Sequence, residues 1–201
     1  MAGSNGVSVL LGNQNSTFGS AVTWITTAGS WCNVADGGET CGPPTTIAIG
    51  DFNGDGKSDL AVNDGTVGGI FVLLGNGDGS FQTPPIHSAN AAGLGGYFNV
   101  LASADFSGNG NLDLAMGVSW SPTQPSPDLF YYAGQGNGSF PFPLELNVGT
   151  GGAYSHADQQ GTPLAVADLN GDGAPDVILG TFPAQEIGSG QQMVVTTKQI
   201  L

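Results

Sequence analysis

The fold of this chain is decided by residues 47–62, which read IAIGDFNGDGKSDLAV. The same pattern recurs without gaps as LASADFSGNGNLDLAM over 101–116 and as LAVADLNGDGAPDVIL over 164–179. A second motif alternates with it: VLLGNGDGSF over 72–81, YYAGQGNGSF over 131–140 and a weaker copy, VLLGNQNSTF, over 9–18. The first acidic residues of the long motif are 54 and 63 residues apart. A period of this size indicates an array of blades or solenoid turns.

Each repeat is predicted to form four short strands. The segments on either side of the acidic stretch are apolar with little polar alternation, as expected of strands buried on both faces. The Asn-Gly and Asp-Gly steps of GNGDGSF supply the positive φ values of a hairpin, and a Pro-bearing segment such as FQTPPIHS suits a sheet edge. Four antiparallel strands per repeat are typical of a β-propeller blade.

The predicted fold class is therefore all-β, with about three and a half blades and an incomplete ring. We expect a partial N-terminal blade over 1–44, full blades over 45–98 and 99–162, and a partial C-terminal blade over 163–201. The chain is either a piece of a larger ring, or its unfinished terminal blades associate with other copies into a ring or a filament. The N-terminal part holds strands three and four and the C-terminal part strands one to three, so the two ends are not simple complements at their edges.

Composition excludes several classes of function. The 201 residues include only 2 Lys and Arg but 16 Asp and Glu, which gives a formal charge of −14. So few cations cannot neutralise a row of phosphates, which argues against nucleic-acid binding and against docking on anionic membranes. We also expect no membrane insertion and no signal peptide, because no apolar run is long enough for a span and the start has no basic region.

The acidic loops have the spacing of a metal site. The pattern D-x-N-x-D-G-x-x-D places oxygen-bearing side chains at positions 1, 3, 5 and 9, and the carbonyl at position 7 can add another oxygen. An all-oxygen set of this kind suits Ca²⁺ rather than Zn²⁺ or Cu²⁺. The predicted ligands of three structural Ca²⁺ ions are Asp51, Asn53, Asp55, Lys57 and Asp59, then Asp105, Ser107, Asn109, Asn111 and Asp113, then Asp168, Asn170, Asp172, Ala174 and Asp176, with Lys57, Asn111 and Ala174 contributing main-chain oxygens.

Other interpretations of these loops are weaker. An EF-hand needs helical flanks and a bidentate Glu at position 12, whereas this chain has Val62, Met116 and Leu179 there. Metal-free Asp/Asn/Gly turns are conceivable for one loop but less so for three in register. A catalytic carboxylate pair is disfavoured, because Asp side chains held on one cation are poor general acids. Three bound Ca²⁺ would raise the formal charge from −14 to −8, and the middle loop, with the fewest carboxylates, should bind most weakly.

These residues resemble the FG-GAP repeat family, also called VCBS or integrin-α-like repeats. GDFNGDGKSDLAV over 50–62 and VLLGNGDGSFQTP over 72–84 are very similar to its consensus. The resemblance implies a β-propeller blade with Ca²⁺ in the loop that joins the first two strands. Members of the family include integrin-α headpieces, fungal lectins and bacterial secreted proteins, so the fold does not fix the function.

The two cysteines, Cys32 and Cys41, flank a polar segment that we expect to be a surface loop. A local disulfide is the preferred interpretation, with two free thiols as the alternative, and zinc is excluded for lack of Cys/His spacing. A disulfide would indicate an extracellular or cell-surface location.

Irregular segments are predicted to gather on the face opposite the acidic loops, where recognition commonly occurs. Trp31, Trp120, Tyr154 and His156 are the candidate ligand residues of that face, although the aromatic side chains could instead pack within their own loops. Asn15 and Asn137 begin N-glycosylation sequons that chance explains equally well.

No catalytic motif is present, so we expect a non-catalytic extracellular scaffold or adhesion module that could also have protein ligands. The alternative is a calcium-dependent lectin.

Overall fold

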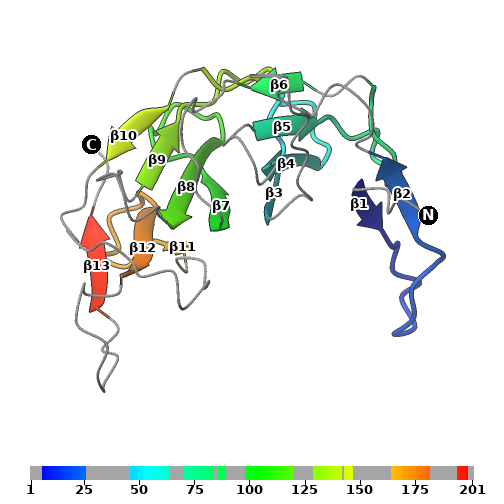
Figure 1. Ribbon diagram of the computed structural model, residues 1–201, viewed down its shortest axis with the longest axis horizontal. Helices are drawn as coiled ribbons and strands as arrows, with labels where there is room; N and C mark the ends of the chain where they lie inside the picture. Colours follow the sequence, from blue (N-terminus) through cyan, green and yellow to red (C-terminus); the bar gives the residue numbers. More distant parts are fainter. Residues whose placement is uncertain are drawn as a thin grey trace, which may run out of the picture.

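The computed structural model describes residues 6–25, 46–63, 70–83, 86–88, 98–119, 129–141, 143–146, 164–181 and 194–198. Every regular element within these ranges is a β-strand, and the strands form separate antiparallel sheets that follow one another along the chain. Figure 1 shows the sheets arranged side by side in an arc. The all-β, blade-type prediction is confirmed, and closure into a propeller stays a prediction.

We number the sheets 1 to 4 in chain order. Sheet 1 contains β1 (Gly6–Val9) and β2 (Val22–Ile25), and sheet 2 contains β3 (Thr46–Gly50), β4 (Asp59–Asn63), β5 (Ile70–Leu73) and β6 (Ile86–Ser88). Sheet 3 contains β7 (Phe98–Ala104), β8 (Asp113–Ser119), β9 (Leu129–Tyr132) and β10 (Leu144–Leu146). Sheet 4 contains β11 (Leu164–Ala167), β12 (Asp176–Thr181) and β13 (Val194–Lys198). In each sheet the spatial order of the strands is their order in the sequence.

The three repeats have the same register around the acidic loop. Gly50 pairs with Asp59 in sheet 2, and the equivalent pairs close the loops of sheets 3 and 4. The first strands lie next to one another on the inner side of the arc, with β3 against β7 and β7 against β11 (Figure 1). The repeated motif therefore places the three acidic loops at the same end of neighbouring sheets.

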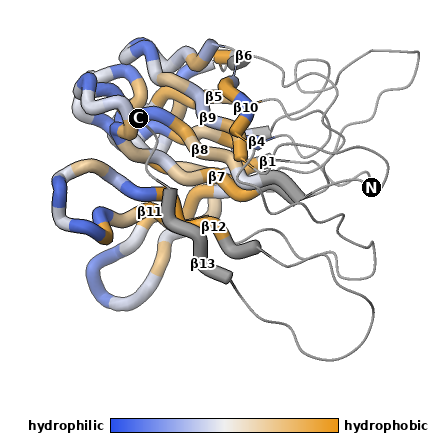
Figure 2. The backbone as a smooth tube through the Cα atoms, turned by 90° about the vertical axis from the view of Figure 1, so that its left-hand side faces the viewer, coloured by the Kyte–Doolittle hydropathy of each residue, from blue (hydrophilic) through white to orange (hydrophobic). Residues whose placement is uncertain are grey.

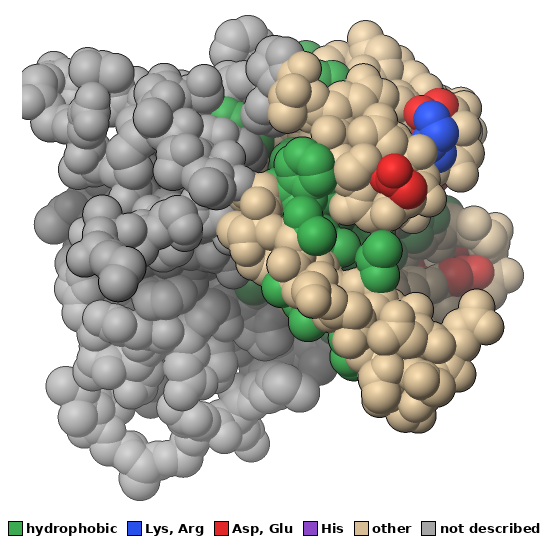
Figure 3. All heavy atoms as spheres, turned by 90° about the vertical axis from the view of Figure 1, so that its right-hand side faces the viewer, with side chains coloured by type: hydrophobic (Ala, Val, Ile, Leu, Met, Phe, Trp, Pro, Cys, Tyr) green, Lys and Arg blue, Asp and Glu red, His purple; other side chains and the backbone are tan. Residues whose placement is uncertain are grey.

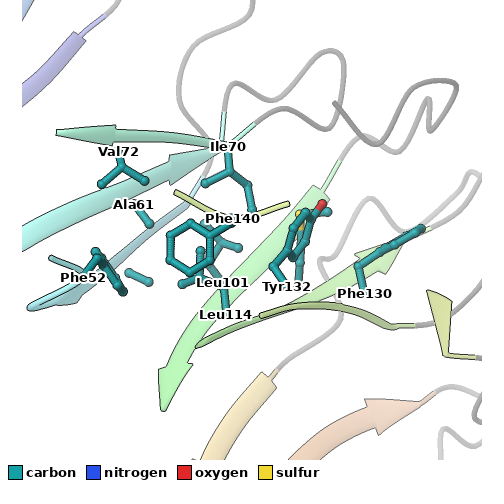
Figure 4. Packing of buried hydrophobic residues seen from close by; sticks show 11 residues of the cluster. Phe52, Ala61, Ile70, Val72, Leu101, Leu114, Phe130, Tyr132 and Phe140 are labelled. Carbon is teal, nitrogen blue, oxygen red and sulfur yellow. The ribbon is translucent and has the colours of Figure 1, made fainter. Parts of the chain in front are cut away.

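Apolar side chains fill the space between consecutive sheets. Strands β4 and β5 are buried along their whole length, because one face packs on sheet 1 and the other on sheet 3. The largest cluster joins sheets 2 and 3 through residues such as Ile70, Phe130 and Phe140 (Figure 4). Tyr132 is also buried there, which raises the pKa of its hydroxyl, and among the described residues that hydroxyl has no hydrogen-bond partner.

The polar turns lie apart from this core. Figure 2 shows the strands as mostly hydrophobic segments and the hydrophilic turns gathered along one side of the molecule. Among the described residues we find no helix long and apolar enough to cross a membrane.

Candidate calcium loops

Each acidic loop is a tight turn between the first two strands of its sheet. In the first loop the glycines at positions 4 and 6, Gly54 and Gly56, have φ values of 74° and 80°. The glycines at the same positions of the other two loops have φ values between 68° and 88°. A side chain at these positions would be strained, which explains why the pattern keeps glycine at position 4 as well as at position 6.

The carboxylate at position 1 organises the loop around itself. One oxygen of Asp51 accepts hydrogen bonds from the amides of Gly54 and Asp55 at 2.8 and 3.1 Å, and the other accepts from Gly56 at 2.8 Å. Asp105 and Asp168 accept from their own loop amides in the same way, at 2.7 to 3.0 Å. These bonds keep the position 1 oxygens inside the turn.

The side chains at positions 3 and 5 also face along the turn. Asn53 accepts a hydrogen bond from the amide of Asp55 at 3.0 Å, and Asp55 accepts from the amide of Lys57 at the same distance. The second oxygen of Asp55 forms an ion pair with Lys57 Nζ at 3.1 Å. The hydrogen bond from the Lys57 side chain is the main reason that the pKa of Asp55 is lowered. Both side chains are partly exposed, so this pair adds little stability and a bound cation could replace it.

The carboxylate at position 9 has a different environment. Asp59 is fully buried; one oxygen accepts a hydrogen bond from the amide of Phe52 at 2.9 Å and the other from the amide of Gly75 at 2.7 Å. Gly75 opens the hairpin between β5 and β6, so Asp59 fastens the acidic loop to the hairpin of the same sheet.

The position 9 carboxylates of the other two repeats also accept hydrogen bonds from main-chain amides. Asp113 accepts from the amides of Ser107 and Gly134 at 3.0 and 2.8 Å and from the Tyr131 hydroxyl at 3.1 Å. Partial burial and then the nearby Asp113 charge raise the pKa of Tyr131. Asp176 accepts from the amide of Leu169 at 2.8 Å.

The position 9 carboxylate acts as a clamp between the acidic loop and the hairpin, and the sequence analysis did not predict this role. The first glycine of the hairpin motif could have indicated it. A Cβ at Gly75 would collide with the carbonyl oxygen of Ser58, and one at Gly134 with that of Leu112. The first glycine of these two hairpins is therefore needed for close approach to the acidic loop, where the buried carboxylate accepts its amide hydrogen bond.

The donor chemistry of positions 1, 3, 5 and 7 suits Ca²⁺, because every candidate atom is an oxygen. Among the described residues, however, no three Asp, Glu, His or Cys side chains group closely enough to hold a metal ion. The position 9 carboxylates face hairpin or loop amides, and the middle loop has Ser107 and Asn109 in place of further acids. Calcium binding by the ligands named above stays a prediction.

Comparison with known families decides what kind of repeat this is. Residues 51–116, from the first residue of the first acidic loop to β8, match the model of the FG-GAP-like repeat. The chain carries an FG-GAP-like repeat. The resemblance predicted from the acidic and hairpin motifs is thereby confirmed over these residues, within a chain of successive β-sheets.

Comparison with solved structures adds little to that assignment. One similar structure is a lectin from Agrocybe aegerita, described for its specific recognition of non-reducing terminal N-acetylglucosamine. It shares 17% sequence identity with this chain at a TM-score of 0.32, over 94% of this chain and 60% of the lectin. This chain thus spans about 60% of the length of that lectin. A search of curated proteins found no match.

The remaining predicted site residues lie outside the described residues. These are Cys32, Cys41, Trp31, Trp120, Tyr154 and His156. Asn15 and Asn137 are described and exposed, each in a hairpin turn.

Proposed function

We propose that this FG-GAP-like chain is a non-catalytic extracellular scaffold whose three acidic loops each bind one structural Ca²⁺ ion. The observation that carries the proposal is the threefold repetition of one loop geometry, with a position 1 carboxylate held inside the turn by loop amides. Loops that differ at half of their positions keep this arrangement, which is expected if the oxygens at positions 1, 3 and 5 serve a shared ligand.

Electrostatics supports a cation at these loops. Lys57 is the basic group paired with an acidic loop in the described part of the chain, and the whole chain has 2 basic residues against 16 acidic ones. Acidic side chains brought together in a turn repel one another unless a cation balances them. Bound Ca²⁺ would therefore stabilise the folded chain by linkage.

A catalytic role for the same carboxylates is less favourable. The position 1 carboxylates each accept two or three hydrogen bonds from amides of their own loop, so both of their oxygens are engaged as acceptors. A general acid must instead hold a proton near neutral pH.

The proposal of a scaffold also includes self-association through the terminal sheets. Glycan binding on the opposite face depends on residues outside the described ones, and we do not adopt it here.

The test is thermal unfolding of the full chain in EDTA, in millimolar CaCl2 and in millimolar MgCl2. Extracellular calcium sites bind with Kd values of about 10⁻⁴ to 10⁻³ M, so three sites should add roughly 5–15 °C to the Tm in CaCl2. Asp55→Asn should lose a measurable part of that gain.

Asp78→Asn is the matched control. Asp78 is also an exposed aspartate that accepts hydrogen bonds from a residue two positions later, but it lies in the hairpin rather than in an acidic loop. Asn137 occupies the same position in sheet 3, so the substitution fits the turn. Asp78→Asn should keep the full calcium gain. A Tm that is equal in EDTA and CaCl2 would refute the proposal.

A further inference from the structure

Sheets 2 and 3 meet through an aromatic contact between a hairpin and an acidic loop. Phe140, in the hairpin of sheet 3, packs edge-on against Phe52, in the acidic loop of sheet 2, with ring centroids 5.5 Å apart. In the same hairpin the amide of Gly138 donates a hydrogen bond to the carbonyl oxygen of Phe52 at 2.8 Å. Both rings are 2% exposed (Figure 4). A hairpin of one sheet thus closes over position 2 of the preceding acidic loop.

The strands give each sheet two distinct faces. We call the face toward the preceding sheet the head face and the face toward the following sheet the tail face. Phe130 and Tyr132 belong to the head face of sheet 3 and pack in the cluster shared with sheet 2. Phe71 and Leu73 occupy the equivalent head face of sheet 2 and pack against sheet 1. Head faces and tail faces are therefore complementary wherever two described sheets meet.

The head face of sheet 1 is exposed although it carries the same kind of residues. Phe18 corresponds to Phe81 and Phe140 in the hairpin motif and is 69% exposed, whereas Phe81 is 8% exposed. Leu10 corresponds to Leu73 and is 49% exposed, against 4% for Leu73. Figure 3 looks onto this end of the molecule and shows a band of hydrophobic side chains at the surface.

The tail face of sheet 4 is exposed in the complementary way. Leu169 occupies position 2 of the third acidic loop, where Phe52 stands in the first, and it is 55% exposed. Ala165, the equivalent of the buried Ala48, is exposed as well. No described residue covers either end face, and each is one half of a contact that the chain forms internally.

We propose that the head face of one copy of this chain packs on the tail face of a second copy, with Phe18 against Leu169. In this contact the Ser16 amide donates a hydrogen bond to the Leu169 carbonyl oxygen of the second copy. The Gly138 amide donates to the Phe52 carbonyl oxygen in the same way within one chain. A second copy is the occupant that fits because it presents the other half of the contact that sheets 2 and 3 form within the chain. This inference rests on the proposed scaffold function and gives its self-association a specific surface.

One further detail fits an interface made of faces. Ser8 and Thr23 are the polar residues of the head face, and their hydroxyls already hydrogen-bond to each other at 2.8 Å. Each of these two hydroxyls therefore keeps one hydrogen bond when the face is covered.

The test measures mass against concentration by analytical ultracentrifugation of the full chain, in CaCl2 and at moderate salt to screen the charge repulsion between acidic copies. The native chain should form head-to-tail assemblies. Phe18→Asp and Leu169→Asp should each weaken association about 100-fold, because a carboxylate would be buried in an apolar contact. Leu144→Asp is the matched control: Leu144 is 56% exposed on β10, away from both end faces, and its substitution should leave association unchanged.

Mixing the two blocked variants gives a sharper result. The Phe18→Asp copy retains an intact tail face and the Leu169→Asp copy an intact head face. Each variant alone should be monomeric, and an equal mixture should form a dimer and nothing larger, because a single head-to-tail contact remains possible. A monomeric native chain at 100 µM, a mixture that stays monomeric, or equal sensitivity to Leu144→Asp would overturn the proposal.

The failure of this inference is separable from that of the proposed function. A chain that gains stability in CaCl2 yet remains monomeric would refute the head-to-tail contact alone. A chain that assembles as described but gains no stability from calcium would refute the calcium scaffold instead.

Discussion

The hairpin over residues 13–18 and the hairpin over residues 76–81 have the same backbone but not the same sequence. In each, the first residue donates its amide to the carbonyl four residues later, at 3.0 and 2.9 Å. Gly77 and Gly79 have φ values of 87° and 88°, and Gln14 and Ser16 at the same positions have values of 59° and 64°. The weaker copy therefore keeps the left-handed turn without the glycines that favour it.

Side-chain hydrogen bonds explain how the weaker copy keeps its shape. Asn15 accepts from the amide and hydroxyl of Thr17, as Asp78 accepts from the amide and hydroxyl of Ser80. The turn is thus specified by an Asx-type residue followed two positions later by Ser or Thr. Glycine lowers the cost of the turn but is not required to form it.

The burial of the two hairpins differs much more than their backbones. Phe81 packs edge-on against Trp24 of sheet 1 at a centroid distance of 5.6 Å, whereas Phe18 is 69% exposed. The local sequence decides the turn, and the neighbouring sheet decides whether its aromatic residue is buried.

The largest effect is expected from the aromatic residues. Phe81→Ala should lower the free energy of unfolding by about 3–5 kcal/mol, because it opens a cavity between sheets 1 and 2. Phe18→Ala should change it by less than about 0.5 kcal/mol in dilute monomer, because the ring is mostly in water. Urea unfolding of both variants measures the difference, and equal losses would show that the two hairpins do not differ in burial.

A smaller effect is expected from the clamp beneath the second hairpin. Asp59→Asn replaces an acceptor oxygen with a donor NH2 group and leaves the amide of Phe52 or Gly75 without a partner. We expect a loss of about 2–4 kcal/mol in the free energy of unfolding.

The clamp measurement belongs in EDTA, so that metal binding does not contribute. Asp55→Asn is the control there, because its ion pair with Lys57 is at the surface and adds little stability. If Asp59→Asn costs no more than Asp55→Asn in EDTA, the buried carboxylate does not act as a clamp.

The smallest effect is expected from the turn residues themselves. Gln14→Gly and Ser16→Gly should each raise the free energy of unfolding by about 0.5–1 kcal/mol, since glycine occupies the left-handed region without a Cβ penalty. Gly77→Gln should lower it by a similar amount. Thermal unfolding resolves these changes when the substitutions are combined. A loss of stability from the glycine variants would contradict the statement that glycine lowers the cost of this turn.

The repeated motifs predicted most of the fold because their chemistry is local. Asp-Gly steps and apolar flanks lie a few residues apart, so the strands on either side of each acidic loop and hairpin could be assigned from the sequence. The buried role of Asp59 could not, because its partner Gly75 is 16 residues away and belongs to another turn. Likewise, Phe18 and Phe81 occupy the same position of the hairpin motif in the sequence. Their difference in burial depends on whether a neighbouring sheet packs against the ring.

The central claim is that the repeated acidic loops hold calcium, and calorimetric titration of the EDTA-treated chain with CaCl2 tests it most directly. We expect three ions per chain, with the middle loop weakest because it has the fewest carboxylates. Asp55→Asn should weaken one site and leave the other two unchanged. Absence of binding at millimolar CaCl2, in a chain that is folded by circular dichroism, would contradict the account.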